Sequence, residues 1–251
     1  LLKSHNLPVN DSKIFWNYEN AYAHLKEAKL PVIVKLPKGA GSSNVIMINT
    51  LKDGKRIIGQ VFNKGVKVHS LKNSSNLASV SKLGTYKFMK KWLKSQLMET
   101  GLMEDKSDYP EWQIQKDAII FQRFLPCNTF DTRVTVIGNR ALAFRRFVRK
   151  NDFRASGSNI LDFDHNKIDR RCVEISFEVS ERLNFSTMAY DFIFDEKHNP
   201  LINEISYSFD DSILTKCPGY WDNELIWHSE QNWPQYYQLS DFLNINDLKK
   251  I

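Results

Sequence analysis

Two apolar segments near the C-terminal end of the chain each carry a carboxylate. The first, Met188–Phe194, contains Asp191, and the second, Pro200–Ser206, contains Glu204. Each segment is apolar enough to form a buried strand, and the polar residues 195–200 between them predict a hairpin. The two acids could therefore meet on neighbouring strands and bind a cation.

The register of this hairpin decides what the two carboxylates can do. A simple register sets three pairs opposite each other: Phe194 with Leu201, Ile193 with Ile202, and Asp191 with Glu204. Like charges held side by side in an apolar sheet repel, so one would stay protonated unless a cation lay between them. A hard divalent ion bound through oxygen, such as Mg²⁺ beside phosphates, removes the conflict. The alternative is a surface hairpin whose acids have no such role.

A second candidate site lies near the N-terminus, where a β-branched run ends on Lys35 and a turn rich in glycine and serine follows. Glycines allow backbone N–H groups to converge on an anion, and serines add hydroxyl donors. The spacing is not that of a P-loop, and the residues after the turn predict a strand rather than a helix. We expect strands at 31–36 and 44–49 with a phosphate-covering loop between them. The alternative is an ordinary turn beside a strand-end lysine.

Together these residues resemble the ATP-grasp superfamily. The resemblance is closest in residues 130–159, where an Asp-x-Arg strand, a glycine turn, a basic strand and a Phe-Arg-Ser-Asn run follow one another. This stretch is similar to the ribosomal-protein glutamate ligases, and D-alanine–D-alanine ligases share the general plan. The similarity extends over about residues 1–207.

The resemblance implies an α+β fold of the ATP-grasp type, in which two α+β lobes clamp the nucleotide. We expect an N-terminal lobe at residues 1–115, with a helical elaboration at about 66–112, and a C-terminal lobe at 116–251 with an aromatic-rich tail. The domain that usually precedes the first lobe is expected to be absent or truncated.

Helices are expected at 50–63, where Gly54 and Gly59 weaken the pattern, and at 83–100. Gly138-Asn139 predicts a two-residue hairpin turn.

The resemblance also implies the cofactors, ATP and Mg²⁺, and the residues that would hold them. The expected nucleotide-binding residues are Lys35, Gly39, Ala40, Gly41, Ser42, Ser43, Gln122, Arg123, Phe124 and Leu125. The expected metal ligands are Asp191, Glu204 and Ser206. The expected catalytic residues are Arg154, Arg133 and Arg145.

The three arginines have different expected roles. Arg154 would stabilise the transferring phosphoryl group and the acylphosphate, while Arg133 and Arg145, on paired strands, would bind an acidic substrate through bidentate contacts. Each could instead be a surface salt-bridge partner. Two positions depart from the family pattern: Gln122 stands where a glutamate is common, and Ser206 stands where an asparagine usually completes the metal motif.

The function that these features predict is an ATP- and Mg²⁺-dependent carboxylate–amine ligase, an enzyme that forms a C–N bond through an acylphosphate. Its expected substrates are a small carboxylate and an amine, such as a sugar or an amino acid. The tail segment 217–222 is similar to ATP-grasp proteins of cell-surface polysaccharide biosynthesis. The alternatives are an ATP-grasp kinase of a small molecule and, from a different class, a basic nucleic-acid-binding module that uses the lysines at 82–94.

Composition narrows the class of protein. The chain has 251 residues, 42% of them hydrophobic and 25% charged, which suits one large or two modest globular domains. The net charge of +6 is modest and spread out, so we expect no nucleic acid as partner.

The apolar stretches are too short to span a membrane. Three widely spaced cysteines predict no metal motif, a place in the core for each, and a cytoplasmic location. A homodimer is the candidate assembly.

Overall fold

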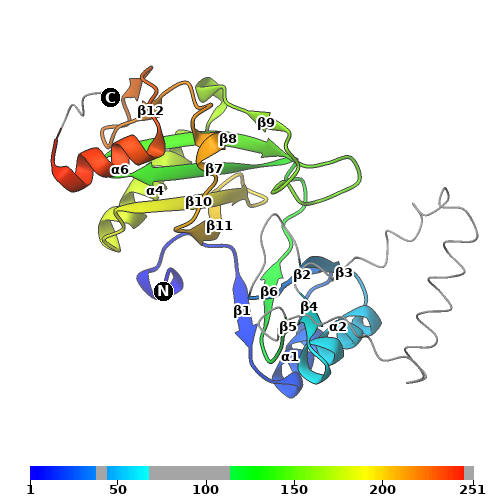
Figure 1. The fold of residues 1–251 in the computed structure, drawn as a ribbon. Helices are drawn as coiled ribbons and strands as arrows, with labels where there is room; N and C mark the ends of the chain where they lie inside the picture. The colour runs from blue at the N-terminus through cyan, green and yellow to red at the C-terminus, as the bar shows by residue number, and fades with distance from the viewer. Residues whose placement is uncertain (38–43, 68–113, 246–251) are drawn as a thin grey trace, which may run out of the picture. The chain divides into compact units, whose positions relative to one another are not determined.

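The computed structural model describes residues 1–37, 44–67 and 114–245. The chain divides into two compact units: Ser12–Phe124, called the small unit below, and Leu1–Asp11 together with Leu125–Ile251, called the large unit. Both are built from antiparallel sheets and helices, so the predicted α+β class is confirmed (Figure 1). The predicted division at residues 115 and 116 stays a prediction; by contacts, the strand at 119–123 belongs to the small unit.

The small unit contains a four-stranded antiparallel sheet of order β1-β6-β2-β3. Its strands are β1 (Ser12–Phe15), β2 (Val32–Lys35), β3 (Val45–Ile48) and β6 (Ile119–Arg123). A separate short pair is formed by β4 (Val66–Lys67) and β5 (Ile114–Gln115). The predicted strands at 31–36 and 44–49 are therefore confirmed within one residue at each end.

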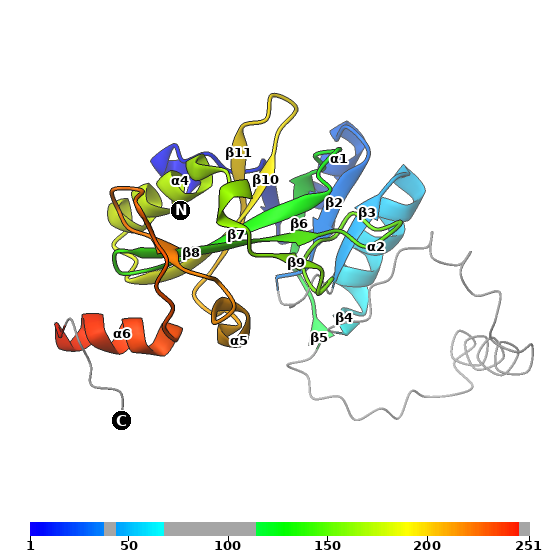
Figure 2. The same ribbon diagram turned by 90° about the horizontal axis from the view of Figure 1, so that it is seen from above.

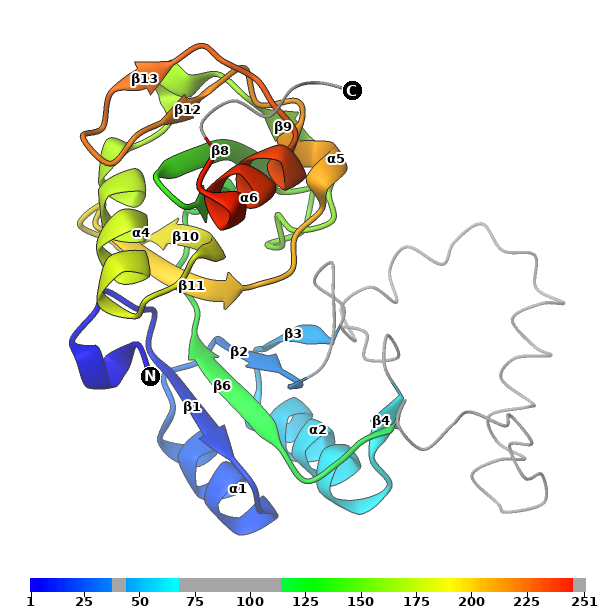
Figure 3. The ribbon, with the colours of Figure 1, turned by 60° about the vertical axis from the view of Figure 1, so that its left-hand side comes forward.

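Two helices cover one face of this sheet, α1 (Tyr18–Glu27) and α2 (Leu51–Asn63), which lie side by side (Figure 3). Side chains cap both N-termini: Asn17 accepts from the backbone of Asn20, and Thr50 accepts from the backbone of Asp53. Alternate strand residues and the inner helix faces form a single apolar core, which removes this surface from water.

The large unit contains a seven-stranded sheet of order β11-β10-β7-β8-β12-β13, with β9 paired to β8. Figure 2 shows β11, β10, β7 and β8 succeeding one another across it. The strands are β7 (Phe130–Ile137), β8 (Arg140–Phe147), β9 (Leu161–Asp162), β10 (Thr187–Phe194), β11 (Pro200–Ser206), β12 (Tyr220–Trp221) and β13 (Trp227–His228). The helices are α4 (Arg170–Arg182), α5 (Asp211–Leu214) and α6 (Pro234–Leu243), with 3₁₀ turns at Lys3–His5 and His165–Lys167.

A two-residue turn joins the central strands β7 and β8, as predicted. Ile137 pairs with Arg140, and Gly138 between them has a φ of +55°, a left-handed conformation that glycine adopts without strain. One face of the sheet packs against α4 in the main apolar core, which includes Val134 and Tyr190. The other face carries the charged side chains described below.

In the β10–β11 hairpin, the predicted pairing at Asp191 is confirmed, and the predicted pairing near the turn is wrong. Asp191 lies opposite Glu204, as predicted. The predicted pairs nearer the turn are wrong by one residue, because the observed pairs are Ile193 with Leu201 and Phe194 with Pro200. A β-bulge at Asn203 inserts one extra residue into β11 and restores the predicted register at Asp191.

The C-terminal tail belongs to the fold of the large unit. Trp221 and Tyr237 are buried, while Trp233 is exposed. The expectation that each cysteine fills the core holds for Cys172 and Cys217 but is wrong for the exposed Cys127. Within residues 1–37, 44–67 and 114–245, no helix is long and apolar enough to cross a membrane. The predicted helix at 83–100 lies outside the described residues.

Candidate functional site

Asp191 lies at the centre of a buried group of charges in the large unit. It is on β10, directly between Arg133 on β7 and Glu204 on β11. Arg133 binds the carboxylate through two contacts, with Nε 2.6 Å from Oδ1 and Nη2 2.8 Å from Oδ2. Arg146 on β8 adds a third contact, with Nη2 2.7 Å from Oδ2 of Asp191. Three charge-assisted contacts therefore fix this carboxylate.

Arg146 also binds Asp131, again through two contacts of 2.7 Å each. The result is a row of four side chains with alternating negative and positive charge, Asp131–Arg146–Asp191–Arg133. We call this row the ion-pair chain. Asp191 and Arg146 are both 5% exposed. Burying single charges at this depth would be costly, but two cations and two anions with matched geometry offset that cost.

Burial and the charges of the ion-pair chain shift the pKa values of the two aspartates in opposite directions. Burial raises the pKa of Asp191, but the positive charges of Arg146 and Arg133 outweigh it and hold that pKa at about 2. Burial raises the pKa of Asp131 to about 6, although its bond to Arg146 favours the ionised form. Asp191 is therefore the firmly ionised member of the pair.

Strand alternation places the members of the ion-pair chain on one face of the sheet. Arg133 and Asp131 are two residues apart on β7, and Asp131 pairs with Arg146 on β8. This face is opposite the one that packs against α4. Arg146 and Asp131 were not among the predicted site residues. Their pairing follows from the two-residue turn at Gly138, which fixes the register of the hairpin.

Arg133 and Arg145 lie on paired strands, as predicted, but they occupy opposite faces. Arg145 pairs in register with Thr132 rather than with Arg133. It forms an ion pair with Asp162 on β9, and its guanidinium lies 4.8 Å from the ring centre of Phe130. The structure therefore does not bring these two arginines to a common substrate group.

Arg154 follows β8 in a loop and is bound by a near neighbour. Its Nε and Nη2 lie 2.9 Å and 2.8 Å from the two carboxylate oxygens of Asp152. This pair lowers the pKa of Asp152, although burial opposes the effect. All three predicted catalytic arginines are thus oriented by an aspartate, which presents the guanidinium in a defined direction.

The predicted metal ligands are close in the sheet but differ in their surroundings. Glu204 is exposed, and the hydroxyl of Ser206 donates to the carbonyl of Ser208 at 2.7 Å. The register of Asp191 opposite Glu204 and the oxygen donors fit a hard cation such as Mg²⁺. The guanidinium groups on Asp191 would have to give way for it to bind one. Within the part of the chain that the structure describes, no three His, Cys, Asp or Glu residues form a ready metal cluster.

Two of the predicted nucleotide-binding residues of the small unit, Lys35 and Gln122, share one sheet face. Lys35 ends β2 and pairs with Ile120, while Gln122 pairs with Ile33 two residues away. Their side chains therefore project from the same face, opposite the core that α1 and α2 cover. Gln122 is buried and Arg123 is exposed.

The remaining predicted nucleotide-binding residues are distributed differently. Phe124 is half-buried at the end of the small unit, and the buried Leu125 begins the second segment of the large unit. The phosphate-covering loop, Gly39, Ala40, Gly41, Ser42 and Ser43, lies outside the described residues.

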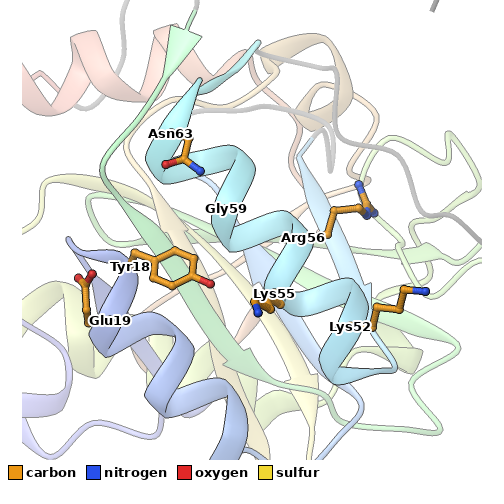
Figure 4. Close-up of a pocket in the computed structure, with 7 residues that line it drawn as sticks. All are labelled: Tyr18, Glu19, Lys52, Lys55, Arg56, Gly59 and Asn63. Atoms are coloured by element: carbon orange, nitrogen blue, oxygen red, sulfur yellow. The ribbon is translucent and has the colours of Figure 1, made fainter. Parts of the chain in front are cut away.

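A surface hollow of about 620 Å³ lies apart from the predicted residues, on the helical side of the small unit. It is lined by Tyr18, Glu19, Lys52, Lys55, Arg56, Gly59 and Asn63 (Figure 4). None of these residues was a predicted site residue. The signal in the sequence is the closely spaced set of cations at 52, 55 and 56.

No protein-family model matches the sequence, and no curated protein is significantly similar to it. Several solved structures are similar over most of the chain. An ATP-grasp protein of the RimK type from Sphaerobacter thermophilus is 13% identical with a TM-score of 0.44, and the match covers 84% of this chain and 57% of that one.

Two further structures are similar to the same extent. A carboxyaminoimidazole synthetase from Staphylococcus aureus, solved with ADP, is 15% identical with a TM-score of 0.49, covering 84% of this chain and 43% of that one. A D-alanine–D-alanine ligase from Coxiella burnetii is 13% identical with a TM-score of 0.40, covering 82% and 44%. The chain spans about half the length of these proteins.

Proposed function

We propose that the protein is an ATP-dependent ligase that joins a carboxylate to an amine through an acylphosphate. The observation that carries the proposal is the ion-pair chain, which orients the partly exposed guanidinium of Arg133 on the sheet face where Asp191 lies opposite Glu204. A carboxylate phosphorylated by ATP develops negative charge on the transferring group. Guanidinium groups already held in place stabilise such charge without reorganisation.

Each predicted residue has a role in this proposal. Lys35 and Gln122, on one face of the small unit, would contact the phosphates and the adenine of ATP, and the loop 39–43 would cover the terminal phosphate. Arg133 would hold the substrate carboxylate or its phosphorylated form, and Arg154 would stabilise the phosphoryl group. Arg145, on the other face of the sheet, would hold β8 to β9 through its ion pair with Asp162 rather than contact the substrate.

Mg²⁺ belongs to the proposal through Asp191 and Glu204, with Ser206 as a weaker third oxygen donor. When bound, it would neutralise phosphate charge and orient the nucleotide. Because Arg133 and Arg146 occupy the oxygens of Asp191, the exposed Glu204 would provide the first contact. Mn²⁺ can replace Mg²⁺ as a paramagnetic probe. We expect Glu204→Gln to weaken Mn²⁺ binding at least about tenfold, measured by electron paramagnetic resonance without substrates.

The proposed reaction is tested by measuring phosphate and ADP release with panels of small acids and amines. A ligase releases phosphate fast only when an acid and an amine are both present. Release of ADP with an acid alone, and a stable phosphorylated product, would instead identify a kinase. ATP-independent binding of DNA or RNA with a steep salt dependence would reject both and favour the nucleic-acid-binding alternative.

The acceptor class also belongs to the proposal. Sugars and amino acids are the first candidates, since the tail segment 217–222 predicts a role in cell-surface polysaccharide biosynthesis. Trp221, in that segment, is buried in the core, so the exposed Trp233 is the better candidate for contact with a sugar ring. A sugar acid that stimulates amine-dependent phosphate release more than an amino acid would support this assignment.

A further inference from the structure

The first two turns of α2 carry three cationic side chains in positions that are electrostatically unfavourable for a helix. Lys52, Lys55 and Arg56 are three and four residues apart, so their charges lie on adjoining positions of the helix surface. They also lie near the N-terminus, where the helix dipole favours anions and disfavours cations. Both effects destabilise the free helix by a few tenths of a kcal/mol for each contact.

The fold does little to neutralise these three cations. Within the described residues no ion pair involves any of them, and Arg56 has a single polar contact, to Gln60 at 3.3 Å. Asp53, between them, accepts from the hydroxyl of Thr50 at 2.8 Å and serves the helix cap. The described residues of the small unit hold eleven lysine and arginine residues against four aspartate and glutamate residues, so the surrounding charge is positive too.

Gly59 provides an independent indication of open space beside α2. Glycine inside a helix costs about 1 kcal/mol relative to alanine, so it needs a reason. Gly54 has one, because a Cβ there would lie 2.4 Å from the side chain of Leu25 where α1 and α2 pack. A Cβ at Gly59 would meet nothing closer than Asn63, at 4.0 Å. Packing does not require Gly59, and the open space beside it is part of the hollow.

Tyr18 completes the lining of the hollow from α1. Tyr18 reaches toward Lys55 across it (Figure 4). Tyr18 also stacks on Tyr22, with ring centres 5.9 Å apart, and the ammonium of Lys55 lies 5.5 Å from the Tyr22 ring. The stacked rings limit the freedom of Lys55 and add a phenolic donor. Glu19 is the one acid among the lining residues.

We propose that this hollow binds a small anion that carries two or more negative charges, such as a polyphosphate or a polycarboxylate. An anion would relieve the repulsion among the three cations. The hollow is open to solvent, so the charges of these side chains would hold the anion rather than enclosure by the protein. The residues that line it are separate from those proposed to bind ATP.

The test follows the backbone amides of α2 by NMR during titration with inorganic tripolyphosphate at 150 mM salt. This readout reports on the hollow even when the probe also binds elsewhere. We expect saturable shifts at residues 52–63. The variant K52E/K55E/R56E should lose them, with affinity at least about tenfold weaker, while its melting temperature stays equal or rises because acidic residues near the helix N-terminus suit the helix dipole.

Matched variants separate a built site from general attraction. K13E/K29E/K64E changes the net charge by the same amount at exposed positions outside the hollow, and it should bind as the wild type does. Gly59→Leu should block binding, whereas Gly59→Ala should preserve it.

Equal loss of affinity in both charge variants would overturn the proposal, because net charge alone would then attract the anion. Shifts with a polyglutamate peptide but not with tripolyphosphate would overturn it as well, in favour of an acidic protein segment. The absence of shifts with either probe would also reject it.

Discussion

At the scale of single residues, the large unit depends on how charge is shared in the ion-pair chain. Asp191 accepts from two arginines, and Arg146 serves two aspartates. The free-energy cost of burying each ion is offset by the opposite charges of its neighbours. The sequence reasoning treated Asp191 as a metal ligand only. The structure adds a second role, the orientation of Arg133 and Arg146.

Removing one charge from this chain should destabilise the protein. Asp191→Asn leaves Arg133 and Arg146 with too little negative charge, and we expect the free energy of unfolding to fall by about 3 kcal/mol. Glu204→Gln changes an exposed carboxylate and should alter stability by less than about 0.5 kcal/mol. Urea denaturation measures both. Equal stability of the two variants would show that the ion pairs of Asp191 contribute nothing.

The same carboxylate predicts a pH dependence. Its pKa is about 2 in the folded protein and near the ordinary value of about 3.9 in the unfolded chain. Its contribution to stability is therefore complete only above about pH 5 and is lost as the pH falls through 4 toward 2, since the unfolded state then binds the proton more readily. The stability difference between wild type and Asp191→Asn should shrink by about 2 kcal/mol between pH 6 and pH 2. A difference that does not change with pH would contradict the assignment.

At the scale of elements, the two glycines of α2 differ in their surroundings, because one is tightly packed and the other is not. Gly54 allows the close approach of α1, because a larger residue would meet Leu25 and Ile48. Gly59 faces open space. The sequence showed both only as interruptions that weaken a helix, and the contact between α1 and α2 is what separates them.

This contrast gives a matched pair of stability predictions. Gly54→Val should lower the free energy of unfolding by about 2 kcal/mol through overpacking. Gly59→Ala should raise it by about 0.5–1 kcal/mol through helix propensity. Thermal unfolding of the two variants beside the wild type checks both. A stabilised Gly54→Val would mean that the helices separate at little cost.

At the scale of the whole molecule, the chain forms two compact units with separate cores, and the first eleven residues belong with the C-terminal unit. The backbone of Ile202 bonds to Pro8 and Asn10, which ties the N-terminal segment to β11. Local sequence patterns could not reveal this link, because it joins residues nearly 200 positions apart.

Separate cores predict separate responses to mutation. Asp191→Asn should reduce hydrogen-exchange protection in β7, β8 and β10, and Gly54→Val should reduce it in α1, α2 and β3. Mass spectrometry of exchanged peptides resolves the two regions. Loss of protection throughout the chain in either variant would show that the units unfold together.

The sequence by itself determined the features that depend on short-range patterns. Strand alternation, the two-residue turn at Gly138 and the helix at 51–63 all follow from local residue types. The turn even fixes the pairing of Asp131 with Arg146, because a hairpin register is set by its turn.

Only the tertiary structure decided the features that depend on several strands or helices at once. The bulge at Asn203, which sets Asp191 opposite Glu204, and the two arginines on Asp191 both require knowing how three strands are arranged. Strand order is set by packing energy summed over a whole sheet, and a local pattern carries no information about a partner on a distant strand.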